Sequence, residues 1–197
     1  MLNHFAIFAM AFLCVSAVSA QNESPTAKGP SGNAAHLSRL VEQTDQPWKQ
    51  QLYQNDIDLK QGENYVLTFW AKASKPLKVK VSTKNGAPPW AFFGLRNDVD
   101  LTTEWTRVEL GFPADEKVIS GHSRLSFNFG GPEAAEIWIA DVRLQKAGAD
   151  PKTTDNLIQN PRFQEELTHW YAEGAQAGVY VCDVQSLSEA GGTPKQK

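Results

Sequence analysis

Apolar and polar residues alternate along several short stretches of this chain with the two-residue period of half-buried β-strands. The alternation is clearest over residues 65–71, where Tyr, Leu, Phe and Ala are separated by polar or small positions. Gly, Pro, Asn and Asp residues separate these stretches, and no long helical pattern interrupts them. The pattern therefore predicts about seven short strands in an all-β fold, an antiparallel β-sandwich or jelly roll. The other alternating stretches are residues 77–81, 105–112, 125–129 and 136–144.

The alternation alone does not assign two further stretches to a strand of the sheet. Residues 34–43 fit either one face of a helix or a strand, and the strand is favoured because everything downstream is β. Two prolines open residues 88–94, which places that stretch on a sheet edge or in a rim loop. The phase of the alternation also predicts core aromatic residues, which are Trp48, Phe69, Trp105, Phe112, Phe127, Phe129 and Trp138.

The first 20 residues have the pattern of a secretory signal peptide. Residues 5–20 carry no acidic or basic side chain, and Val18-Ser19-Ala20 forms a small-residue cleavage site before the polar Gln21. The apolar run is shorter than the ~20 residues that a membrane-spanning helix needs. We therefore expect a secreted or periplasmic protein with no membrane partner.

Composition predicts a linker after the signal peptide and gives no sign of nucleic acid as a partner. Residues 21–33 are predicted to be a disordered linker, because Ser, Pro, Gly and Asn dominate there. The chain has 19 basic and 22 acidic residues, so nothing indicates nucleic acid as a partner. Without its first 20 residues it keeps one cysteine, Cys182, in an apolar stretch that predicts a buried thiol. We expect a monomer stabilised by its core.

Residues 48–73 and 136–144 contain motifs of a known family. W-x-x-Q-L begins at Trp48, G-x-x-Y-x-L-x-F-x-A-K-A begins at Gly62, and residues 136–144 resemble a closing strand usually written V-W-I-D-D-V-x-L. These motifs are similar to those of cellulase-associated carbohydrate-binding modules of families 4, 9 and 22, which are galactose-binding-like sandwiches. The resemblance covers about residues 48–144, with a second patch from residue 156, and the module itself is expected to span residues 34–146. It implies a non-catalytic module that binds a β-glucan, xylan or cellulose-like polysaccharide in a shallow groove, as an accessory to a glycoside hydrolase.

Sugar-binding faces combine aromatic rings that stack on sugars with amides that pair with hydroxyl groups. Gln51 matches the glutamine of W-x-x-Q-L, and Tyr53, two residues later, shares its face. A solvated sheet face is the alternative for Gln51 and Asn128, and a packed or loop-anchoring role is the alternative for the aromatic candidates. The further candidate residues are Trp70, which must point away from Phe69, and Trp90, Phe92 and Asn128.

The C-terminal stretch resembles the beginning of such a module. It reads N-L-I-Q-N-P-R-F-Q at residues 156–164, after a linker at residues 147–155. Residues 156–185 are too few to bury a core of their own. They either complete the same sandwich, as a circular permutation would, or begin a truncated second module; we favour the first. Residues 186–197 are predicted to be a disordered tail.

Modules of this family often carry a structural calcium ion bound by carboxylates near the chain ends. Two of the usual acidic positions are neutral here, which leaves Asp141 as a candidate ligand and no other cofactor. No nucleophile, zinc or phosphate-binding motif is present, so we expect no enzyme activity. Two alternatives remain open: a protein-interaction or envelope sandwich with a blocked groove, and a small glycoside hydrolase on a jelly-roll scaffold.

Overall fold

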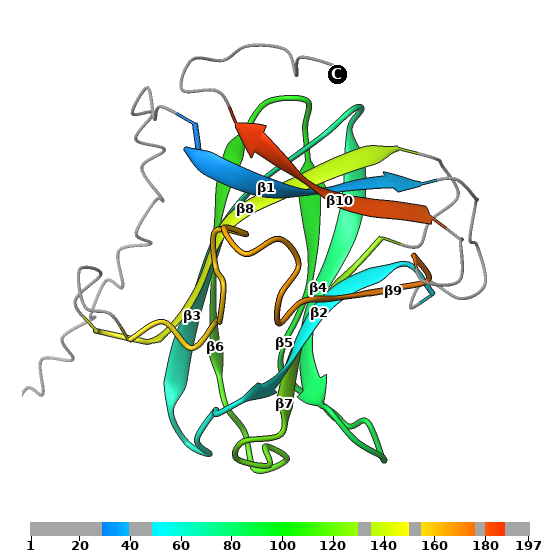
Figure 1. Ribbon diagram of the computed structural model, residues 1–197. Helices are drawn as coiled ribbons and strands as arrows, with labels where there is room; N and C mark the ends of the chain where they lie inside the picture. The colour runs from blue at the N-terminus through cyan, green and yellow to red at the C-terminus, as the bar shows by residue number, and fades with distance from the viewer. Residues whose placement is uncertain (1–28, 40–48, 130–134, 150–154, 176–179, 188–197) are drawn as a thin grey trace, which may run out of the picture.

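Ten β-strands and no α-helix make up the described part of the chain (Figure 1). The computed structural model describes residues 29–39, 49–129, 135–149, 155–175 and 180–187. The strands are β1 (Gly32–Arg39), β2 (Gln51–Ile57), β3 (Asn64–Ala73), β4 (Leu77–Asn85), β5 (Phe92–Leu101), β6 (Thr106–Pro113), β7 (Ser123–Asn128), β8 (Glu136–Lys146), β9 (Tyr171–Glu173) and β10 (Tyr180–Leu187). Residues 32–39 form a strand, as the pattern favoured.

The strands form two five-stranded sheets that face each other. One sheet, named here the β3 sheet, has the order β10-β1-β8-β3-β6, and the other, the β2 sheet, has the order β5-β4-β7-β2-β9. Neighbouring strands are antiparallel in every pair. The predicted antiparallel β-sandwich is confirmed.

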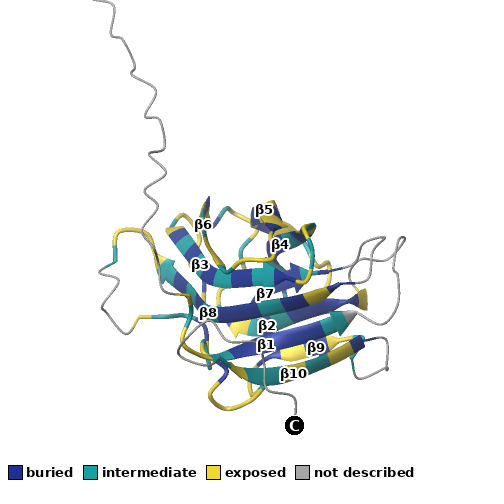
Figure 2. Ribbon diagram, turned by 90° about the horizontal axis from the view of Figure 1, so that it is seen from above, coloured by how far each residue is buried: buried dark blue, intermediate teal, exposed yellow. Residues whose placement is uncertain are grey.

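Residues on the inner faces of the two sheets form one apolar core. Phe69 from the β3 sheet meets Phe127 from the β2 sheet edge to face, with ring centroids 5.0 Å apart. Figure 2 shows how buried and less buried positions alternate along strands such as β3. Other fully buried side chains are Leu37, Leu52, Ile57, Leu59, Leu67, Leu95, Leu101, Phe129, Phe163 and Tyr180.

Two tryptophans that were predicted to lie in the core do not. Trp138 lies between Ile137 and Ile139, which are both buried, so strand alternation turns its ring to the outer face of the β3 sheet. Trp105 precedes β6 and is only partly buried, close to Lys72. The predicted core positions of Phe69, Phe112, Phe127 and Phe129 are confirmed.

The C-terminal segment supplies an edge strand to each sheet. β9 pairs with β2 at Gln51, Leu52 and Tyr53, and β10 pairs with the whole of β1. Figure 1 shows the connection to β9, in orange, running from β8 between the edges of the two sheets. The strands extend slightly beyond the predicted limits, because Gly32 and Asn33 pair with Leu187 and Ser186.

Side chains of this segment fill the core and tie it to both sheets. Phe163 is fully buried, and its ring lies 5.3 Å from that of Trp170. The Asn156 carboxamide accepts a hydrogen bond from the backbone nitrogen of Leu144 in β8, at 2.9 Å. On the other sheet, Gln54 bonds the backbone of Gln159 through both its oxygen and its nitrogen. The segment is therefore joined to β8 and to β2.

Some sequence predictions concern residues outside the described ranges. These are the signal peptide at residues 1–20, most of the linker at residues 21–33, the core position of Trp48 and the tail from residue 188. Within the described ranges, no helix has the length and apolar character needed to cross a bilayer.

Candidate functional site

The outer face of the β2 sheet brings aromatic and polar side chains together from all five strands. The register aligns Tyr171, Tyr53 and Ser126 across β9, β2 and β7, and continues through Ser82 to Arg96 on β5. Because alternate residues of a strand share a face, neighbouring cross-strand rows lie on the same surface. We call this surface the aromatic face. It comprises Gln51, Tyr53, Lys84, Trp90, Phe92, Arg96, Arg124, Asn128, Tyr171 and Glu173.

Two tyrosines form one end of the aromatic face. The rings of Tyr53 and Tyr171 stack with centroids 5.3 Å apart and planes within 16° of parallel. Tyr171 is 48% exposed, so one ring of the pair is open to solvent. Sequence reasoning found Tyr53 but missed Tyr171, although the Trp170-Tyr171 pair in a module-like opening was the available signal.

Cationic side chains connect these tyrosines to the aromatic residues at the other end. The guanidinium carbon of Arg124 lies 3.9 Å from the ring centroid of Tyr53 and 5.3 Å from that of Trp90. Lys84 Nζ lies 5.8 Å from the Trp90 ring and 5.9 Å from the Phe92 ring. All four distances allow cation–π attraction. Rings and cations therefore alternate across the sheet.

Trp90 and Phe92 present open rings at this second end. Trp90 is in the β4–β5 connection, where its backbone nitrogen donates a 2.9 Å hydrogen bond to Ala87 O. It is 43% exposed, and Phe92 at the start of β5 is 42% exposed. A side chain this exposed adds little to the core and is available for stacking. The loop position predicted from the two prolines is confirmed for Trp90.

The predicted amides lie on the same face but are already engaged. Gln51 Nε2 donates a hydrogen bond to Glu173 Oε2, and the Gln51 side chain is buried. Asn128 Nδ2 donates to Lys80 O at 3.1 Å and to Ser82 Oγ at 3.4 Å. In this arrangement the two amides hold neighbouring groups of the same sheet in place.

Burial changes the pKa values of the charged groups on this face. Loss of solvation lowers the pKa of Lys84, and repulsion from Arg124 lowers it further. Burial likewise lowers the pKa of Arg124, whereas it raises the pKa of the Tyr53 hydroxyl. The tyrosine is therefore neutral at physiological pH, and the two cations are poorly solvated.

Trp70 does not join the aromatic face. It belongs to β3, on the opposite sheet, where its side chain lines an outer hollow of about 370 Å³. Arg107, Asp141 and Arg143 also line this hollow. The structure thus separates Trp70 from Gln51, Tyr53, Trp90, Phe92 and Asn128, because β3 and β2 lie in different sheets.

Asp141, the candidate calcium ligand, is held by two arginines. Its Oδ1 accepts hydrogen bonds from Arg143 Nε at 3.2 Å and from Arg162 Nε at 3.1 Å. No group of three or more acidic, His or Cys side chains suited to a metal occurs among the described residues. Calcium needs several oxygen ligands with negative charge, and two guanidinium groups oppose it. This donor set does not fit a calcium ion.

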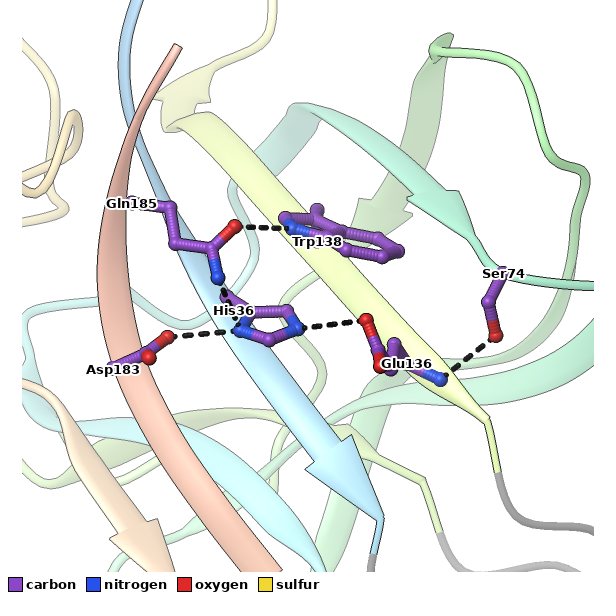
Figure 3. A network of polar contacts seen from close by, with 6 residues as sticks. All are labelled: His36, Ser74, Glu136, Trp138, Asp183 and Gln185. Carbon is purple, nitrogen blue, oxygen red and sulfur yellow. Dashed lines mark hydrogen bonds and ion pairs between the residues drawn. The ribbon is translucent and has the colours of Figure 1, made fainter. Parts of the chain in front are cut away.

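A second polar cluster, shown in Figure 3, lies on the outer face of the β3 sheet. His36 stacks on Trp138 with ring centroids 4.8 Å apart, and its two nitrogens lie 2.9 Å from Asp183 Oδ1 and 3.2 Å from Glu136 Oε2. The Ser74 hydroxyl accepts a hydrogen bond from the backbone nitrogen of Glu136, not from His36. The cluster links β1, β8 and β10 and lacks the nucleophile-to-histidine bond of an acyl-transfer site.

Cys182, on β10, gives a prediction that follows from its burial. Burial raises the pKa of its thiol to about 12, from a usual value of 9.0. The thiolate is the reactive form, so its fraction at neutral pH falls by about a thousandfold. In a chain starting at Gln21, where Cys182 is the sole thiol, we expect very slow reaction with a disulfide reagent in native buffer. Full reaction in guanidinium chloride is the control, and rapid native reaction would show that the partly buried thiol is open to the reagent.

Comparison with known proteins agrees with this geometry. A family model described as a carbohydrate binding domain, CBM_4_9, matches residues 18–135, which is more than half of the chain. The chain belongs to this carbohydrate-binding domain family. The match includes most of the aromatic face but ends before β8, so the carbohydrate-binding domain also has three strands beyond the matched residues.

Solved structures of carbohydrate-binding modules share the fold of this domain. The module titled "PbXyn10C CBM APO" has a TM-score of 0.61 and 24% identity, with 82% of this chain and 92% of that chain covered. A module titled "CBM4 structure and function" has a TM-score of 0.53 and 26% identity, covering 57% of this chain and 70% of that one. The second N-terminal cellulose-binding domain of Cellulomonas fimi β-1,4-glucanase C has a TM-score of 0.50 and 24% identity, covering 58% and 76%. No curated protein matches the sequence of the domain.

Proposed function

We propose that this carbohydrate-binding domain is a non-catalytic module that holds a polysaccharide chain along the aromatic face. The observation that carries the proposal is the run of rings from Tyr171 and Tyr53 to Trp90 and Phe92, with Arg124 between them. Successive sugars of a chain can stack on rings that are distributed across a sheet, while neighbouring polar groups bond their hydroxyls. A β-glucan, xylan or cellulose-like chain fits this arrangement, and one structural relative is named for cellulose binding.

The exposure of the rings favours binding over a blocked face. Among the described residues, the C-terminal segment adds β9 to the sheet edge and leaves Tyr171, Trp90 and Phe92 between 42% and 48% exposed. A protein-interaction sandwich with its groove blocked by this segment would bury them. This observation argues against the blocked-face alternative.

The two carboxylates near the rings, those of Glu173 and Asp98, are each engaged by another side chain. Hydrolysis of a glycosidic bond needs two carboxyl groups on either side of that bond, one of them free to act as acid. Glu173 accepts a hydrogen bond from Gln51, and Asp98 is paired with Lys80. These contacts support a binding role without catalysis.

The proposed function includes where the protein acts and with which partner. The apolar leader and its cleavage pattern support export to the periplasm or beyond the cell, where polysaccharides are met. A module of this kind would act there as a monomer, as an accessory to a glycoside hydrolase. The strand order fits a circular permutation, since the end of β10 pairs with the start of β1 and a short turn would join Leu187 to Gly32.

Affinity electrophoresis tests the proposed function. The protein is run through native gels that contain soluble xylan, β-glucan, hydroxyethyl cellulose or no polysaccharide, beside a non-binding reference protein. We expect retardation in at least one of the polysaccharide gels, because a ligand fixed in the gel slows a protein that binds it. Equal mobility in all the gels would contradict the proposal.

A further inference from the structure

We infer that the glycan bound on the aromatic face is acidic and carries uronic acid carboxylates that pair with Arg124 and Lys84. The inference rests on the proposed function and names its ligand class. It arises from the charges of the face, which differ from those of the whole chain. The chain has a net charge of −3, whereas the face carries Lys84, Arg96 and Arg124 against the carboxylate of Glu173. Asp98, at the border of the face, is already paired with Lys80.

None of the three cations of the aromatic face forms an ion pair with a carboxylate of the described residues, and Glu173 attracts Lys84 and Arg124 only from beyond ion-pair distance. Arg124 Nε donates a 2.7 Å hydrogen bond to Asn55 Oδ1, which is neutral. Lys84 and Arg96 face aromatic rings, and no carboxylate of the described ranges lies within ion-pair distance of either. Other lysines of the same sheet, by contrast, do form ion pairs.

Lysines on the remainder of β4 are neutralised across the sheet. Lys78 is paired with Asp100 at 2.5 Å, and Lys80 is paired with Asp98. The register continues this pattern to Lys84, but there the partners are Phe92 on one side and Arg124 on the other. Lys78 and Lys80 of β4 are therefore paired with carboxylates, whereas Lys84, which lies beside the aromatic rings, is not.

Burial makes this lack of partners costly. Arg124 is 8% exposed and Lys84 is half-buried, and the two are cross-strand neighbours of like charge. Poor solvation and mutual repulsion both disfavour their charged forms, which is the cause of the lowered Lys84 pKa. A buried charge is stable when it is paired with an opposite charge, and cation–π contact replaces only part of its hydration. An anionic group of the ligand would supply the missing charge.

The positions of the rings restrict what this anionic ligand can be. Arg124 lies between Tyr53 and Trp90, so a sugar stacked on either ring places its substituents beside the guanidinium group. The two Nη atoms of Arg124 make no hydrogen bond to the described residues, and a guanidinium edge suits a carboxylate in two-point geometry. Stacking and charge together indicate a polysaccharide with carboxylated sugars.

A matched pair of polymers tests the inference. Glucuronoxylan and the same polymer after chemical reduction differ only in whether the uronic acid residues carry a carboxylate or a neutral hydroxymethyl group, and titration calorimetry gives the affinity for each. We expect the acidic polymer to bind about tenfold more tightly or better, and this preference to shrink when salt rises from about 0.02 M to about 0.5 M. Sulfated xylan is a third arm, expected to bind less tightly than the carboxylated polymer.

Single substitutions show which residues cause the preference for the acidic polymer. Arg124→Gln and Lys84→Gln should each reduce the preference for the acidic polymer, while Lys78→Gln, on the same strand outside the aromatic face, should leave it unchanged. If Arg124→Gln fails to fold by circular dichroism, Lys84→Gln decides. Equal affinity for both xylans, or tighter binding of the sulfated one, would overturn the inference and leave the proposed function intact. Loss of binding to every polymer, neutral ones included, would overturn the proposed function itself.

Discussion

Replacing Phe163 with alanine is expected to lower the free energy of unfolding by about 3–5 kcal/mol, the usual cost of removing a buried ring. Phe163 is 0% exposed, and its ring packs against Trp170, which in turn lies 6.4 Å from Phe127 of β7. The phenyl ring therefore joins the C-terminal segment to the main core. Urea denaturation followed by tryptophan fluorescence measures the loss.

A second phenylalanine provides the control for this measurement. Phe92 is 42% exposed, so Phe92→Ala should change the free energy of unfolding by only about 0.5 kcal/mol. Equal stability of the Phe163→Ala variant and the unchanged protein would show that residues 155–175 do not complete this core. It would favour a truncated second module instead.

Replacing Trp90 with alanine is expected to weaken polysaccharide binding by about 30-fold, or about 2 kcal/mol, the loss typical of an aromatic hot spot. Its ring is among the most exposed of the aromatic face and lies 5.3 Å from the guanidinium carbon of Arg124. The substitution removes a stacking surface but little core, so stability should hardly change. Titration calorimetry with the polysaccharide that retards the protein most gives the affinity.

Trp70 provides the matched control for the binding experiment. Trp70 also has a partly exposed ring, but it lies in β3, on the opposite sheet. Trp70→Ala should therefore bind polysaccharide as tightly as the unchanged protein. If Trp70→Ala bound more weakly while Trp90→Ala bound normally, the glycan would lie on the β3 sheet, which would contradict binding on the aromatic face.

Local alternation was sufficient to predict the sandwich and part of the site. Gln51 and Tyr53 are two residues apart on one strand, so their common face follows from the strand itself. The same rule was misapplied to Trp138, whose buried neighbours Ile137 and Ile139 place its ring outside the core. The phase was assigned there with Trp138 among the core positions, although its neighbours Ile137 and Ile139 have the opposite phase and are the buried ones.

The rest of the site depends on contacts between distant parts of the chain. Tyr171 reaches Tyr53 only because β9 pairs with β2, more than a hundred residues away in sequence. Trp70 was grouped with the site because no local pattern tells which of two sheets a strand joins. Arg124 was missed for a similar reason, since a lone arginine in an alternating strand gives no signal until its cross-strand neighbours are known.

The central claim is that a glycan binds to the outer face of the β2 sheet. Nuclear magnetic resonance of isotope-labelled protein, titrated with a soluble oligosaccharide of the polymer that binds, tests it most directly. Amide signals from β2, β4, β7 and β9 and from the Trp90 loop should shift with ligand concentration, while those of β1, β3 and β8 should stay. Shifts confined to β1, β3 and β8, around His36 and Trp70, would contradict the account.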